Sequence, residues 1–351
     1  MYDKIPEIQK ILFPDLPQTP LLLPLYFHSV IFVRNLTSMA FTAFRDMKPF
    51  PQLMFSVFVI LVCFLVFMVI SLIIVMPIFG INNLLSVPSL NEMYSAENIM
   101  VLKYLQVIQA IGLFIIPPLI LGWLYHGKVL EYLYMNKSFA PVSILLIFLL
   151  MFFASPFVNF IGEMNANMNL PNWLSGVEEW MRDAEEKAAQ LTTAFLNVDS
   201  YWGLLFNLFM IAFLPAIGEE LLFRGVIQRI FTNMTHNHNL GIWISAILFS
   251  ALHMQFYGFV PRMLLGVLFG YLLVWSGSMW LPILAHFLNN GIAVIAMFMI
   301  DKEMLSPKVE EVGSTSESYY MAAISLGLVI VFMMMIKRQN AGSQLQLEEV
   351  K

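Results

Sequence analysis

A chain of 351 residues of which 59% are hydrophobic and only 12% are charged has too little polar surface for a soluble protein, because soluble domains carry about 25% charged residues. The composition predicts an all-α polytopic membrane protein and excludes a sizeable soluble domain. The net charge of −5 says little about partners. We expect the lipid bilayer around the chain, and no nucleic-acid partner.

Eight apolar segments are candidate membrane-spanning helices, since about 20 apolar residues cross a bilayer. The segments cover approximately residues 53–79, 102–125, 140–161, 202–224, 240–256, 259–276, 279–300 and 320–336. The fifth and sixth are short and close together, which predicts a tight helix pair. A shorter apolar run at 21–33 suits a segment at the membrane interface.

The distribution of Lys and Arg between the loops predicts the orientation, because basic residues are enriched in cytoplasmic loops. With eight crossings, the basic residues before the first span and after the second, fourth and eighth lie on one side. The opposite loops are 80–101, which has no Lys or Arg, and the acidic 162–201. We therefore expect both termini in the cytoplasm and the protein in the plasma or inner membrane.

The acidic loop also contains the signature of a surface helix. Ser175 and Glu178 have the spacing of a capping box, in which each side chain binds the other's backbone N–H. Apolar residues at helical spacing follow them. We expect an amphipathic helix near 175–196 on the outer membrane surface.

Ionisable residues inside the apolar spans are the main functional signal. A charge at bilayer depth costs roughly 2.5 to 3.5 kcal/mol, so such residues are paired, hydrated or functional. Glu220 and Arg224 are four residues apart on one helical face and can form an ion pair, whereas Glu219 points about 100° away. We expect Glu220 to be held ionised and Glu219 to be free for general-base chemistry.

Two histidines and an asparagine on the following spans extend this cluster: His253, His286 and Asn290. Helix tilt could bring them and the carboxylates together in a cavity in the cytoplasmic half of the membrane. An imidazole and a carboxylate can deprotonate a water, while a second imidazole and a carboxamide can stabilise a developing oxyanion. This set of side chains is sufficient for peptide-bond hydrolysis.

Other intramembrane protease chemistries lack their residues. The six aspartates lie outside the spans or at a span's end, and no His-Glu-x-x-His motif is present. Ser245 and Ser250 have no Gly-x-Ser-x-Gly turn. Cys63 has no identifiable histidine partner.

Three motifs in this order on successive apolar spans resemble those of the CPBP family, also called the Abi family, which contains the type II CAAX prenyl endopeptidases. The motifs are Glu219-Glu220-x-x-x-Arg224, Phe249-x-x-x-His253 and His286-x-x-x-Asn290. The match covers about residues 202–295. The resemblance implies an intramembrane endopeptidase with eight helices and a site in the membrane that opens toward the cytoplasm and the bilayer.

The resemblance also implies the roles of the site residues. These are water activation by Glu219 and His253, oxyanion stabilisation by His286 and Asn290, and support by the Glu220 and Arg224 ion pair. A divalent metal such as zinc, held by Glu219, His253 and His286, is compatible with these residue types, and so is a metal-free mechanism.

The chain is expected to have four parts. They are a cytoplasmic and interfacial segment (1–50), N-terminal membrane helices with the amphipathic helix (51–200), a CPBP-like catalytic core (201–300), and the last membrane helix with a cytoplasmic tail (301–351).

Several alternatives remain open at this point. The cluster would also suit an ion- or proton-coupled transporter, or a noncatalytic membrane protein that binds a peptide or acts in immunity. Asn290 could instead bridge two helices, and Asn289 could take its place. The substrate could be a prenylated carboxyl-terminal peptide, a secreted peptide precursor or a membrane protein.

Overall fold

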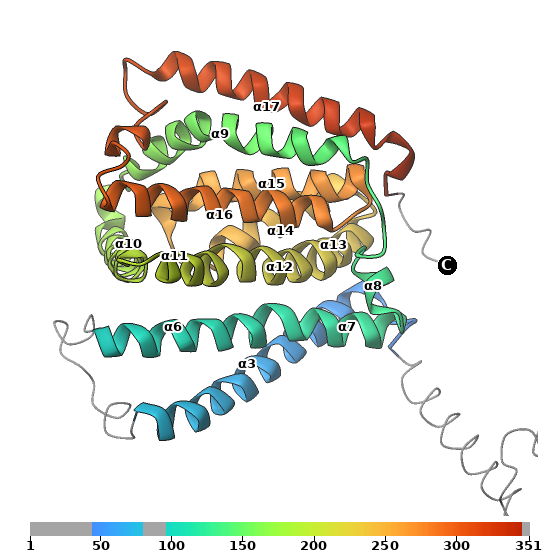
Figure 1. The fold of residues 1–351 in the computed structure, drawn as a ribbon. Helices are drawn as coiled ribbons and strands as arrows, with labels where there is room; N and C mark the ends of the chain where they lie inside the picture. The colour runs from blue at the N-terminus through green and yellow to red at the C-terminus, as the bar shows by residue number, and fades with distance from the viewer. Residues whose placement is uncertain (1–43, 80–95, 346–351) are drawn as a thin grey trace, which may run out of the picture. The chain divides into compact units, whose positions relative to one another are not determined.

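The computed structural model describes residues 44–79 and 96–345 (Figure 1). The interfacial segment expected at 21–33 and most of the loop 80–101 lie outside these ranges. The ordered secondary structure of the described residues is helical and includes no strand, which confirms the all-α class. Residues 1–47 and 48–351 form two separate units, and the helices described below belong to the second.

The elements follow one another along the chain with short connections. They are α3 (Pro49–Phe79), α6 (Ala96–Ala110), η2 (Ile111–Ile115), α7 (Ile116–His126), α8 (Val129–Tyr132), α9 (Val142–Ala166), η3 (Asn172–Leu174), α10 (Ser175–Leu196), α11 (Tyr201–Asn207), η4 (Leu208–Phe213), α12 (Leu214–Glu220), η5 (Leu221–Ile227), α13 (Gln228–Thr235), α14 (His238–Ala251), η6 (Phe256–Gly258), α15 (Phe259–Ser276), α16 (Trp280–Asp301), η7 (Pro307–Val309), α17 (Tyr319–Gln339) and η8 (Ala341–Ser343).

Seven helical segments of the described chain are long and apolar enough to cross a membrane. The protein is therefore a multi-pass integral membrane protein. The eighth predicted span, 240–256, corresponds to α14, which has only 14 residues and a length of about 21 Å at 1.5 Å per residue. It packs against α15, as expected for a tight helix pair. The fourth span extends to Thr235, beyond its predicted end at 224, because its last turns are too polar for an apolar window.

Three π-helical turns, η2, η4 and η5, widen two of the membrane helices. After η2 and η4, the next α-helix has proline in its first two positions, Pro117 in α7 and Pro215 in α12. Proline lacks an N–H and its ring clashes with the carbonyl four residues earlier, so the preceding turn cannot keep regular α-helical hydrogen bonds. The third turn, η5, contains no proline and carries Arg224.

The amphipathic helix predicted near 175–196 is α10, but the predicted capping box is wrong. The N-cap residue is Leu174, which has no side chain to cap the helix. Glu178 instead accepts a hydrogen bond from the backbone N–H of Leu170 (3.1 Å) and pairs with Arg182 (2.7 Å). The turn before α10 therefore folds back over the helix and takes the carboxylate that the capping box requires.

The connection between α14 and α15 packs on α10. The carboxylate of Glu185 accepts the backbone N–H of Tyr257 (3.1 Å), and Trp180 lies against Phe256 with ring centroids 5.1 Å apart. Helix α10 also contacts α6, α11 and α16. The α14–α15 connection therefore lies on the same side of the protein as the loop 162–201.

Helices α9 and α17 run side by side although the core segment 201–300 separates them in sequence (Figure 1). At one end the Asn340 side chain donates to Ser143 Oγ (2.9 Å) and accepts the backbone N–H of Ala140 (3.0 Å). Helices α15 and α16 share an apolar core with α9 and the end of α17. This core supports the two helices that carry the C-terminal half of the candidate site.

The predicted orientation can be tested at Ser175, which is exposed at the start of α10. In a Cys63→Ser background, we expect Ser175→Cys to react with a membrane-impermeant maleimide in intact cells, because the acidic loop 162–201 is expected outside. A Ser343→Cys control should react only after permeabilisation. Labelling of Ser175→Cys only after permeabilisation would reverse the predicted orientation.

Candidate functional site

The candidate site residues come from three neighbouring helical segments. Glu219 and Glu220 end α12, and Arg224 follows in η5. His286 lies in α16, which contacts α12, and η5 contacts both α14 and α15. The three motifs are thus brought to one region of the helix bundle.

A buried ion pair links Glu220 and Arg224, as predicted from their spacing. Arg224 Nη1 lies 2.9 Å from Glu220 Oε1, and the two side chains are 1% and 0% exposed. His286 Nδ1 lies 2.8 Å from the same oxygen. Because the ionised carboxylate can only accept, we assign a proton to His286 Nδ1. Glu220 therefore orients a histidine as well as pairing with an arginine.

Aromatic rings and a backbone carbonyl complete the surroundings of Arg224. Its guanidinium carbon lies 4.7 Å from the ring centroid of Phe249 and 5.4 Å from that of Phe269, distances typical of cation–π interactions. Nη2 donates to the Gly266 carbonyl (3.1 Å). A Cβ on Gly266 would lie 3.3 Å from Nη2 and 3.1 Å from Ala246 Cβ, so glycine allows this close approach.

The second imidazole nitrogen of His286 faces Glu219. His286 Nε2 and Glu219 Oε2 are 3.8 Å apart, longer than a hydrogen bond. Phe269 stacks on the imidazole with centroids 5.2 Å apart and planes at 19°. The Glu219 side chain is 12% exposed and accepts no hydrogen bond from the described residues. Of the two neighbouring carboxylates, one is bound twice and the other is free, as predicted.

His253 lies just beyond the end of α14 and is exposed. Its Nδ1 lies 2.7 Å from the Phe249 carbonyl, which can only accept, so Nδ1 carries the proton and Nε2 can act as a base. Phe249 contacts both imidazoles, with centroids 5.0 Å from His253 and 6.1 Å from His286. Within the described part of the chain, no carboxylate lies within 4.0 Å of His253. The structure therefore does not bring His253 into direct contact with Glu219.

Asn290 bridges two helices. Its Nδ2 donates to the Ile211 carbonyl in η4 (3.0 Å), and its Oδ1 accepts from Asn289 Nδ2 (3.0 Å). This geometry fits the helix-bridging alternative. One of the two amide N–H groups remains available, so oxyanion stabilisation by Asn290 stays a prediction.

Arg262 is a charged residue near the site that the motifs do not include. It lies in the first turns of α15, donates to the Gln255 side chain (2.8 Å) and backbone (3.3 Å), and interacts electrostatically with Glu219. The signal that singled out Glu219, an ionisable residue inside an apolar span, applies equally to Arg262 and could have found it.

The three candidate metal ligands do not form a ligand set in this arrangement. His286 Nδ1 is bound to Glu220, His286 Nε2 is 3.8 Å from Glu219, and His253 contacts neither carboxylate. Across residues 44–79 and 96–345, no group of three His, Cys, Asp or Glu side chains is arranged to hold a metal. The chemistry below is therefore derived from the side chains alone.

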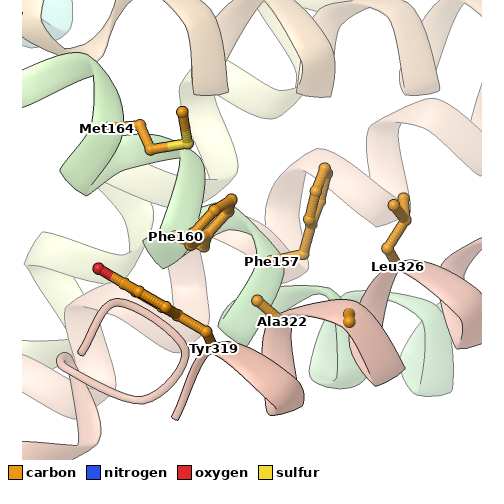
Figure 2. A pocket seen from close by; sticks show the side chains of 7 residues that line it. Phe157, Phe160, Met164, Tyr319, Ala322 and Leu326 are labelled. Carbon is orange, nitrogen blue, oxygen red and sulfur yellow. The ribbon is translucent and has the colours of Figure 1, made fainter. Parts of the chain in front are cut away.

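A cavity of about 520 Å³ lies between α9 and α17, away from these residues. Figure 2 shows that apolar side chains line it, among them Phe157, Phe160 and Leu326, with Tyr319 beside them. None of the candidate site residues belongs to this lining.

Comparison with known proteins agrees with the site. Residues 201–292 match the family model described as type II CAAX prenyl endopeptidase Rce1-like. Residues 201–292 form an Rce1-like domain. This segment contains all three motifs, so the resemblance to type II CAAX prenyl endopeptidases is confirmed for this part of the chain.

A curated relative of the Rce1-like domain is the uncharacterized protein YpbD of Bacillus subtilis (strain 168). It is 30% identical over 90 residues, which are 24% of this chain and 43% of YpbD. The match thus spans less than half of that relative's length. No solved structure matches the chain.

Proposed function

We propose that the protein is an intramembrane endopeptidase that hydrolyses a peptide bond of a membrane-associated peptide or protein. The observation that carries this proposal is the chain of contacts Arg224–Glu220–His286, which holds an imidazole opposite the free carboxylate of Glu219. A carboxylate that orients an imidazole is a recurring arrangement in hydrolytic sites. The Rce1-like match over the same residues supports the same reaction class.

In the proposed mechanism, a water molecule binds between Glu219 and His253 Nε2. Glu219 takes a proton from this water as the hydroxide attacks the peptide carbonyl, and later gives a proton to the leaving amine. No covalent intermediate with the enzyme forms. The support is that the Glu219 carboxylate has no hydrogen bond within the described chain, and that the Phe249 carbonyl fixes the His253 tautomer.

The oxyanion in this scheme is stabilised by His286 and Asn290. Nε2 of His286 can donate only when both ring nitrogens carry protons, and Glu220 already binds the Nδ1 proton. The free amide N–H of Asn290 is the second donor. Their buried position strengthens hydrogen bonds to a developing charge.

The function is tested by incubating the purified protein in lipid vesicles with candidate membrane peptides and following cleavage by mass spectrometry. We expect cleavage by the wild type, no effect of serine- or cysteine-directed covalent inhibitors, and loss of activity in a Glu219→Ala, His253→Ala double variant. A chelator arm tests for a metal requirement. Wild-type rates in the double variant would refute the mechanism, and proton-coupled solute flux that the two changes abolish would indicate a transporter.

Asn290→Ala is expected to lower kcat by about 10² to 10³ with little change in KM, as for other oxyanion donors. Asn289→Ala is the matched control, because it keeps the hydrogen bond from Asn290 to Ile211. If Asn290 only bridges helices, its removal should lower Tm while kcat of the folded protein stays near the wild-type value. Measuring Tm and kcat for both variants separates the two roles.

A further inference from the structure

The guanidinium of Arg262 is held in place by the connection between α14 and α15. Nη2 donates to Gln255 Oε1 (2.8 Å) and Nη1 to the Gln255 carbonyl (3.3 Å). The group also lies close to Gly258, where a Cβ would approach Nη2 to 3.2 Å. Arg262 is thus fixed by neutral groups.

The positive charge of Arg262 is not neutralised by a contacting carboxylate. No Asp or Glu of the described chain lies within 4.0 Å of the Arg262 guanidinium, whereas Arg224 is paired at 2.9 Å. Arg262 nevertheless interacts electrostatically with Glu219 and Glu185, and with His253. A guanidinium has five N–H donors, and Gln255 uses two of them. A half-buried, unpaired cation in an apolar segment is costly to keep without a function.

We propose that Arg262 determines substrate specificity by binding a carboxylate of the peptide next to the bond that is cut. This inference rests on the proposed function. A peptide carboxylate near the site would be repelled by Glu219, and the fixed guanidinium offsets that repulsion. The planar guanidinium binds a carboxylate through two parallel hydrogen bonds, which an ammonium cannot match. The carboxylate can belong to an acidic side chain or to the carboxyl terminus of the peptide.

A purely structural role for Arg262 would act through α10. Glu185 interacts electrostatically with Arg262 and binds the backbone of Tyr257, so the arginine could help to dock the α14–α15 connection. Glu185→Gln removes this charge without changing the region around Glu219. It is therefore the matched control for a docking effect.

The experiment compares Arg262→Gln, Arg262→Lys and Glu185→Gln with the wild type on four versions of one cleavable peptide. The peptides carry either Glu or Gln beside the cleaved bond, and either a free or an amidated carboxyl terminus. We expect Arg262→Gln to raise KM about 10- to 100-fold for the version whose carboxylate is recognised, as for a lost hydrogen bond to a charged group. KM for the neutral version should be unchanged, and Arg262→Lys should restore part of the loss.

The pair of peptides that responds identifies the source of the carboxylate. Equal KM values for charged and neutral peptides in the wild type, or an equal loss for all peptides in Arg262→Gln and Glu185→Gln, would overturn the inference. If the wild type cleaves none of the peptides, the proposed function fails. Binding of the same fluorescently labelled peptides to wild type and Arg262→Gln then still tests carboxylate recognition, and equal affinities would reject it.

Discussion

Glu219→Gln is expected to abolish most hydrolysis while the protein remains folded. The side chain is nearly isosteric, accepts no hydrogen bond from the described residues, and is 3.8 Å from the nearest histidine nitrogen. Its loss therefore removes the general base and little packing. General-base catalysis contributes about 10² to 10⁴ in rate, so kcat should fall by at least about 10². The measurement is kcat on a cleaved membrane peptide, with Tm in detergent for folding.

Glu220→Gln is the comparison for this variant, because it changes the neighbouring carboxylate in the same chemical way. It should lower both activity and Tm, since Glu220 binds Arg224 and His286 through one oxygen. The division between a free and a bound carboxylate would be wrong if the two variants lost the same amount of thermal stability.

Arg224→Ala is expected to have the largest effect on folding. The change leaves the Glu220 carboxylate, which is 0% exposed, without its cation, and removes a guanidinium packed between Phe249 and Phe269. Breaking a buried ion pair by removing one partner costs about 3 to 5 kcal/mol. We expect a much lower yield of folded protein and a clear decrease in Tm, measured by thermal denaturation in detergent.

The chain offers a matched control for this prediction in α10. Arg182 and Glu178 are also an i,i+4 pair, but Arg182 is 51% exposed. Exposed pairs contribute about 0 to 1 kcal/mol, so Arg182→Ala should change Tm little. Similar Tm losses for Arg182→Ala and Arg224→Ala would contradict a special role for the buried pair.

The two predictions test different consequences of the same geometry. Glu219 acts in the proposed reaction, whereas Arg224 maintains the position of Glu220 and, through it, of His286. A variant that loses activity with an intact fold and another that loses the fold would separate these functions. Both results would support an endopeptidase site in which only one of two adjacent carboxylates takes part in chemistry.

The sequence by itself determined the properties that depend on composition and local spacing. Apolar runs locate membrane helices because every helix in lipid must present an apolar surface. The Glu220–Arg224 pair follows from their separation of four residues on one helix. The order of the three motifs was likewise sufficient to identify the Rce1-like segment.

Only the tertiary structure decided which groups from different helices meet. His286 binds Glu220 across 66 residues of sequence, and Asn290 reaches the Ile211 carbonyl in a π-helical turn across 79. Arg262 is held by Gln255 in the connection before its helix. Such contacts depend on helix tilt, rotation and local widening, which packing against neighbouring helices determines. Local spacing fixes the partners of a residue on its own helix, but it carries no information on the side chain that a neighbouring helix presents.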